Sequence, residues 1–162
     1  MRTEELIDGI QALFEQHDRM ARDPHKTRSE AELRTSEFIR SYNELQRALI
    51  IPFVQKAGKA IQAKGHSYRI DEIPGGTPWS HAKASFAADA GMQMTITLKH
   101  PIPSTLAFVC EGRNERVWCK VSVGYNDPSP PTSLLLPELN EEFVAGKIAS
   151  ILRPLLGLAA AA

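Results

Sequence analysis

The spacing of apolar residues between positions 27 and 65 predicts one long amphipathic helix. The apolar residues recur at intervals of three and four, which is the period of one helical face; they are Phe38, Tyr42, Leu45, Leu49, Phe53, Ala57 and Ala60. Ser29 and Glu32 have the spacing of a capping box, and Gly65 follows Lys64 where a left-handed residue ends many helices. We therefore expect the helix over residues 28–64.

Pro52 lies inside this predicted helix. It has no N–H for the carbonyl of Ala48, and its ring crowds that carbonyl, at a cost of about 3 kcal/mol in a helix interior. The helix therefore either kinks at Pro52 or breaks there into two helices. A kink is favoured, because the apolar stripe continues in phase through Phe53 and Ala57.

A first helix is predicted over residues 3–21, with Thr3 as its cap. Its apolar side holds Leu6, Ile10, Leu13, Phe14, His17 and Met20. The lone His17 is expected to be a half-buried residue of this stripe, since it has no partner base or second ligand. Asp23-Pro24-His25 ends the helix, and so short a connection favours an antiparallel helical hairpin with the long helix.

After Gly65 the apolar period changes from 3.6 to 2, which indicates strands. Strands are expected over residues 66–73, 81–88 and 92–100 and around 106–110 and 117–123, with loops between them, such as the Gly/Pro-rich residues 74–78. Alternation is clearest in the third strand, where Met92, Met94, Ile96 and Leu98 face inward. The pattern predicts an antiparallel meander over residues 67–124 with one apolar face.

Residues 126–133 are proline-rich and are expected to be a loop, followed by a helix over residues 138–153 and a tail over 154–162. The predicted fold is α+β in a single domain of residues 1–162. It combines an N-terminal helical hairpin containing one long kinked helix, a four- to five-stranded antiparallel meander and a C-terminal helix. The apolar sheet face must be covered, and the long helix is the best candidate to cover it.

Charge and composition narrow the functional classes. The 162 residues include 19 Lys plus Arg and 19 Asp plus Glu, so no net field attracts nucleic acid or anionic lipid. Arg113, Arg116 and Lys120 near Trp118 are offset by Glu111 and Glu115, and no nucleic-acid partner is expected. No apolar run is long enough to span a bilayer. Two cysteines without a secretory signal indicate a reducing, cytoplasmic setting.

No catalytic, phosphate-binding or zinc-binding motif is present, so no enzyme class, cofactor or metal is indicated. His81 and His100 are the pair that most suggests a metal site. Pairing Ala88 with Met92 would set Ser80 opposite His100 and leave the two histidines on opposite faces of the sheet. No third ligand accompanies them, so no metal site is expected.

Cys110 and Cys119 are both expected to face inward. With residues 112–115 as the turn, Cys110 lies opposite Val117 and Cys119 opposite Phe108, which favours two small buried thiols. A turn two residues longer would set the cysteines opposite each other, and a disulfide is then conceivable.

The favoured functional hypothesis is a non-enzymatic protein-interaction module, with an unknown protein or a second copy of itself as partner. Its motives are the length of the predicted helix and the apolar pair Val109 and Trp118, which has outward parity on the sheet. Such a patch indicates either a partner, which makes these residues a candidate interface, or a covering element. The N-terminal hairpin and the C-terminal helix are the alternatives for such a cover.

The second hypothesis is a small-molecule binder or enzyme with a pocket between the sheet and the long helix. Its candidate ligand-binding residues are the lining residues Tyr42, Met92, Met94 and Phe108, with Trp79 as a lid in the Gly/Pro-rich loop. The alternative for Trp79 is an aromatic residue tucked onto the sheet edge.

Overall fold

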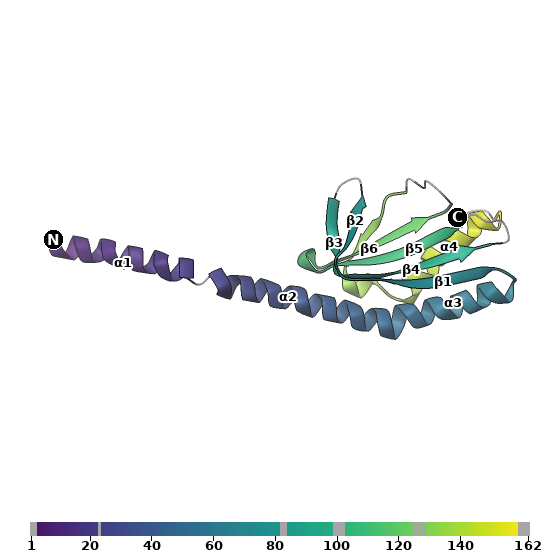
Figure 1. Ribbon diagram of the computed structural model, residues 1–162, viewed down its shortest axis with the longest axis horizontal. Coiled ribbons are helices and arrows are strands. Elements are labelled where there is room, and N and C mark those ends of the chain that lie inside the picture. Colours follow the sequence, from purple (N-terminus) through teal and green to yellow (C-terminus); the bar gives the residue numbers. More distant parts are fainter. Residues whose placement is uncertain are drawn as a thin grey trace. The chain divides into compact units, whose positions relative to one another are not determined.

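The computed structural model describes residues 3–22, 24–81, 84–98, 103–124, 127 and 129–158 (Figure 1). Its contacts divide the chain into two compact units, Met1–Thr35 and Ser36–Ala162. Whether both units belong to one cooperative domain, as expected from the chain length, stays a prediction.

The N-terminal unit contains α1 (Thr3–Arg22) and the first part of α2 (Pro24–Leu45). The first predicted helix is thereby confirmed, and Glu4 and Glu5 lie in its first turn, where the helix dipole favours them. α2 begins at Pro24, four residues before the predicted start, because proline suits the first helical turn. The antiparallel pairing of the two helices stays a prediction, and the side chain of His17 lies outside the described residues.

The long helix is continuous through Pro52 and changes its winding there. α2 passes into a π-helical turn, η1 (Gln46–Ile50), and then into α3 (Ile51–Ala63), with Pro52 in the first turn of α3. The N–H of Ile51 donates to the carbonyl of Gln46, five residues back, which is the π pattern. The wider turn accommodates the proline ring, so the kink is confirmed and the break is not found (Figure 1).

The π-turn also shifts the buried stripe of this helix. Beyond Tyr42, the predicted stripe residues are half-buried or exposed. The buried residues each come one position later; they are Gln46, Ile50, Val54, Gly58 and Ile61. A regular α-helix has 3.6 residues per turn, and the π-turn adds about one residue to one turn. The predicted stripe residues Leu45, Leu49, Phe53 and Ala57 do pack against the core, but the most buried positions lie one residue later than predicted.

The sheet has five antiparallel strands in the order β1-β4-β5-β6-β7. Their bounds are Ser67–Ile73, Ala90–Thr97, Ser104–Glu111, Arg116–Ser122 and Thr132–Leu134. The predicted strand count is confirmed, but one strand differs in identity. β7 comes from the proline-rich segment that was expected to be a loop.

Between β1 and β4, the chain leaves the sheet as a separate two-stranded ribbon, β2 (Thr77–His81) and β3 (Ala84–Ala88) (Figure 1). Gly76, at a φ of +89°, forms the turn that starts the ribbon, and its N–H donates to the Ala88 carbonyl at 2.7 Å. The predicted pairing of Ala88 with Met92 was wrong, because β4 pairs with β1 and β5 instead.

The predicted placement of His81 and His100 on opposite faces of one sheet depended on that pairing, which does not occur. His81 is paired with Ala84 in the ribbon. His100 lies outside the described residues.

The register of β5 and β6 is confirmed. Cys110 pairs with Val117, Phe108 with Cys119, and Val109 with Trp118. The chain reverses through a 3-10 turn, η2 (Gly112–Asn114). Both cysteines are buried free thiols, so the interpretation without a disulfide is confirmed.

The core lies between the inner sheet face and two helices, the long helix and α4 (Glu141–Leu155). Asn140 caps α4, since its side-chain oxygen accepts a hydrogen bond from the Phe143 N–H at 2.9 Å. The largest fully buried side chains come from all of these elements; they include Tyr42, Ile50, Val54, Met92, Met94, Ile96, Leu106, Phe108, Val117, Val144 and Ile151.

Candidate functional site

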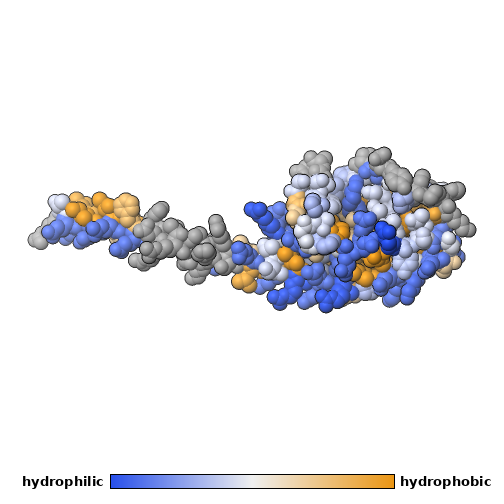
Figure 2. Space-filling model, viewed as in Figure 1, coloured by the Kyte–Doolittle hydropathy of each residue, from blue (hydrophilic) through white to orange (hydrophobic). Residues whose placement is uncertain are grey.

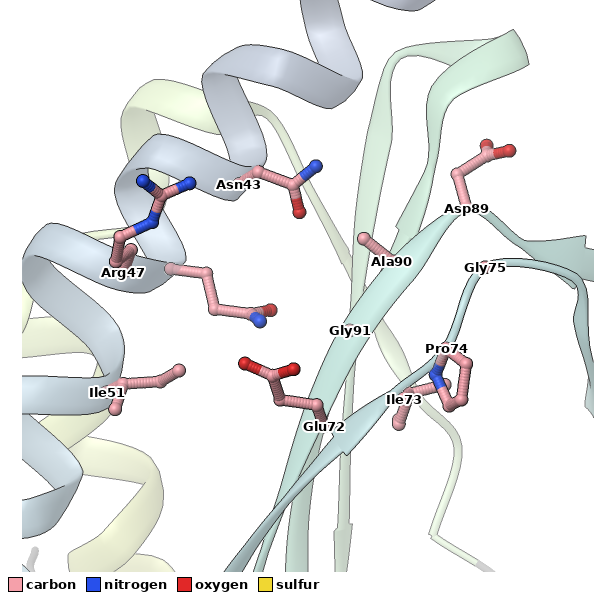
Figure 3. Close-up of a pocket in the computed structure, with 11 residues that line it drawn as sticks. Asn43, Arg47, Ile51, Glu72, Ile73, Pro74, Gly75, Asp89, Ala90 and Gly91 are labelled. Atoms are coloured by element: carbon pink, nitrogen blue, oxygen red, sulfur yellow. The ribbon is translucent and has the colours of Figure 1, made fainter.

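A cleft of about 360 Å³ opens between the π-turn and the sheet, where β1 ends and β4 begins. One wall is the long helix, with Asn43, Gln46, Arg47 and Ile51, and the other is formed by residues 72–75 and 89–91 (Figure 3). We call this site the π-turn cleft. π-turns are rare in helices and often lie at functional sites.

An unsatisfied polar group lies at the helix wall of the π-turn cleft. Gln46 is only 7% exposed, and its Oε1 is buried without a hydrogen-bond partner among the described residues. One turn earlier, the buried hydroxyl of Tyr42 also has no partner in that part of the chain. Burial raises the pKa of the Tyr42 hydroxyl, so it stays neutral. A buried acceptor without a donor costs about 1–3 kcal/mol.

The cleft presents charges of both signs. The carboxylate of Glu72 points from β1 into the space, and Arg47 lies on the opposite, helical wall (Figure 3). Asp89 is held differently, because its Oδ2 accepts a hydrogen bond from the Gly112 N–H at 2.7 Å. A small polar molecule with both an anionic and a cationic group would find a counter-charge for each.

Close backbone packing shapes the sheet wall. A Cβ on Gly91 would lie 2.5 Å from the Phe108 carbonyl oxygen, so only glycine fits at this position. Among the described residues that line the cleft there is no cysteine, serine or histidine. In the described part of the chain, no group of three or more His, Cys, Asp or Glu residues could hold a metal.

The residues predicted to line a pocket lie elsewhere. Tyr42, Met92, Met94 and Phe108 are fully buried in the core, and none of them lines the π-turn cleft. They fill the space between sheet and helix themselves. Trp79 lies on β2 rather than in a loop, and its ring centroid is 5.3 Å from that of Phe86.

The outward pair Val109 and Trp118 is covered by the ribbon. The rings of Trp79 and Trp118 are 5.9 Å apart, Val109 is fully buried and Trp118 is half-buried. The expected cover was the N-terminal hairpin or the C-terminal helix, and the ribbon takes that place. A role of the pair in an interface stays a prediction.

A second opening, the α3–α4 groove, has a volume of about 390 Å³. Its walls are the C-terminal halves of α3 and α4, with Leu98 and His66 between them. Sequence reasoning missed both openings. The signal for the first was Gln46, a polar residue beside an apolar stripe; the signal for the second was the surplus of leucines near the end of α4.

No protein-family model matches the chain, and no curated protein or solved structure is significantly similar to it. No helix in the described residues is long and apolar enough to cross a membrane.

Proposed function

We propose that the protein is an interaction module that self-associates through the apolar face of α1. The supporting observation is the exposure of five large apolar side chains, between 49% and 66% each. They are Leu6, Ile7, Ile10, Leu13 and Phe14. Figure 2 shows these hydrophobic residues along one side of α1, with hydrophilic residues along the other.

The spacing of these residues suits a helical partner. Leu6, Ile10 and Leu13 follow the alternating four-and-three spacing of a coiled-coil seam. Ile7 and Phe14 lie beside the seam and widen it. Burying each such side chain contributes about 1.5–3 kcal/mol relative to full exposure, so a helix that covers this face gains a substantial hydrophobic contribution.

The order of charges favours a second copy in antiparallel orientation. The first half of α1 carries three acidic residues, Glu4, Glu5 and Asp8, whereas in the second half Glu15 and Asp18 are balanced by Arg19 and Arg22. Two antiparallel copies set the acidic half of one helix against the neutral half of the other, whereas two parallel copies bring the two acidic halves together. A lipid surface is a poorer partner, because helices that lie on membranes are rich in Lys and Arg.

The test is the molar mass of the full chain by light scattering, from low to high micromolar concentration. The expected result is a rise above the 17.9 kDa of the monomer. Leu13→Glu places a charge in the seam and should hold the mass at that of the monomer.

Ala12→Glu is the matched control, because it adds the same residue on the opposite side of α1 and should leave association unchanged. A monomeric wild type at every concentration would contradict the proposal. That outcome would favour the competing antiparallel hairpin, in which the face packs within its own chain.

A second candidate function is the binding of a small polar molecule at the π-turn cleft. The buried, unpartnered Oε1 of Gln46 and the opposed charges of Arg47 and Glu72 favour it. Free amino acids carry both an ammonium and a carboxylate and are the first probes to test. A screen should find at least one amino acid that raises the unfolding temperature.

The matched pair of variants for this candidate is Glu72→Gln and Glu44→Gln. Glu72 lines the cleft, whereas Glu44 is exposed on α2 and does not line it. The first substitution should reduce the shift in unfolding temperature and the second should not. Equal shifts in both variants, or none in the wild type, would rule the candidate out.

A further inference from the structure

The α3–α4 groove combines apolar walls with one charged end. Ala57, Ala60 and Ile61 of α3 face Ile148, Leu152 and Leu156 of α4, with Leu98 between the two helices. Its volume of about 390 Å³ lies at the small end of the roughly 300–1,000 Å³ of ligand pockets. Leu156 is 51% exposed, so the groove presents apolar surface that gains from being covered.

The titratable groups that line the groove are both basic. Lys64 and His66 are the titratable residues among those that line it, and no carboxylate is in that set. Lys64 caps the C-terminal end of α3 and is exposed. The Nδ1 of His66 is buried without a hydrogen-bond partner in the described part of the chain. An anionic group at this end of the groove would find a counter-charge in the Lys64 ammonium, and His66 would supply a hydrogen-bond donor beside it if its Nδ1 carries the proton.

We propose that the α3–α4 groove binds a medium-chain aliphatic carboxylate, with its chain between α3 and α4 and its carboxylate at Lys64 and His66. The apolar walls select the chain by the hydrophobic effect. Among the described residues that line the groove, Lys64 is charged and none is acidic, which favours an anionic over a cationic head group. This site is separate from α1 and from the π-turn cleft, so the inference does not rest on the proposed function.

The test compares three probes of equal chain length by calorimetric titration of the full chain: decanoate, decan-1-ol and decylammonium, each below its micelle-forming concentration. Decanoate should bind saturably with one molecule per chain. Decylammonium should bind at least about tenfold more weakly, the loss expected for one charge-assisted hydrogen bond. Equal affinity for decanoate and decylammonium, or no saturable binding of decanoate, would overturn the proposal.

Two lysine variants separate the head-group contact from a general charge effect. Lys64→Gln should weaken decanoate binding about tenfold and leave decan-1-ol binding unchanged. Lys59→Gln is the control, because Lys59 is exposed on the same helix and does not line the groove. Equal effects of the two substitutions would overturn the head-group assignment.

NMR identifies which residues lie near the bound decanoate. Decanoate should shift the signals of His66, Leu98 and Leu152 and leave those of Asn43 and Glu72 in the π-turn cleft unchanged. Shifts confined to the π-turn cleft would overturn this inference and support the second candidate function instead. Binding of decanoate by the Leu13→Glu variant should match binding by the wild type, because Leu13 is not among the residues that line the groove.

Discussion

At the scale of single residues, Gly58 sets how closely α3 approaches β1. A Cβ at this position would collide with the ring of Tyr68, including the atom nearest its backbone. Gly58→Ala gains about 1 kcal/mol of helix propensity, but overpacking costs about 1–3 kcal/mol. We expect a net loss of stability, measured as a lower midpoint in urea unfolding.

Gly146 provides the control for that substitution. It lies inside α4, and a Cβ there would meet no atom within 4 Å. Gly146→Ala should therefore raise stability by about 0.5–1 kcal/mol. If both substitutions stabilise the protein equally, the close approach of α3 to Tyr68 does not hold in solution.

The two thiols give a residue-scale prediction with a pH dependence. Burial raises the pKa of Cys110 to about 12, helped by the charges of Asp89 and Glu111. Burial also raises the pKa of Cys119 to about 12, which the charge of Lys147 lowers in part. Alkylation needs the thiolate, so it should stay slow in the native protein between pH 7 and pH 9, a range set by the ordinary thiol pKa of about 8.5.

In denaturant without reductant, the same reagent should find two thiols per chain, because both cysteines are free. Rapid labelling of one thiol in the native protein would contradict the burial of both.

At the scale of elements, the π-turn allows the long helix to contain Pro52 and still keep one buried face. Ala48 is exposed in this turn, and its deletion would convert the turn to α-helix while keeping both halves of the stripe in phase. Pro52 would then crowd the carbonyl four residues before it, at a cost of about 3 kcal/mol. The deletion alone should therefore lower the free energy of unfolding, and adding Pro52→Ala should restore much of it.

Chemical unfolding of the single and double variants checks this prediction. Pro52→Ala in the full-length helix is the reference for the proline itself. A deletion variant as stable as the wild type would show that the π-turn does not serve to accommodate the proline.

Local patterns were sufficient for those elements whose neighbours follow them directly in sequence. The register of β5 and β6 was predictable because the turn at residues 112–115 joins strands with clear alternation. The ribbon was not, because β1 and β4 pair across the intervening residues 74–89. Short-range alternation in Phe86 and Ala88 is the same whether their strand pairs with β2 or with β4.

The candidate sites were harder to predict than the fold. A pocket requires space that side chains leave empty, and alternation only indicates which side chains face inward. Met92, Met94 and Phe108 face inward as predicted and fill the core. The π-turn cleft depends on a change of helical winding, and no propensity scale would place Gln46 at its wall.

At the scale of the whole molecule, the described core depends on the second unit only. The first residue of the hydrophobic cluster and its packed neighbours is Phe38, whereas the exposed apolar face of α1 belongs to the first unit. We expect a chain that begins at Ser36 to fold with an unfolding temperature close to that of the full chain. It should remain monomeric at concentrations where the full chain associates.

Calorimetry and light scattering on the shortened chain test both expectations. A shortened chain that fails to fold would show that the two units form one cooperative domain, as the chain length alone suggests.

The detour of the chain between Ile73 and Gly91, which pair directly, has a consequence for how this protein tolerates change in evolution. The ribbon connects β1 and β4, which are paired directly at the point where the ribbon begins and ends. Its length can therefore vary without altering the hydrogen bonding of the sheet. Insertions, deletions and replacements in the ribbon are therefore compatible with an unchanged sheet. Each such change would also alter how one face of β5 and β6 is covered. Variation among descendants of this sequence should therefore concentrate there, while the strands on either side keep their lengths.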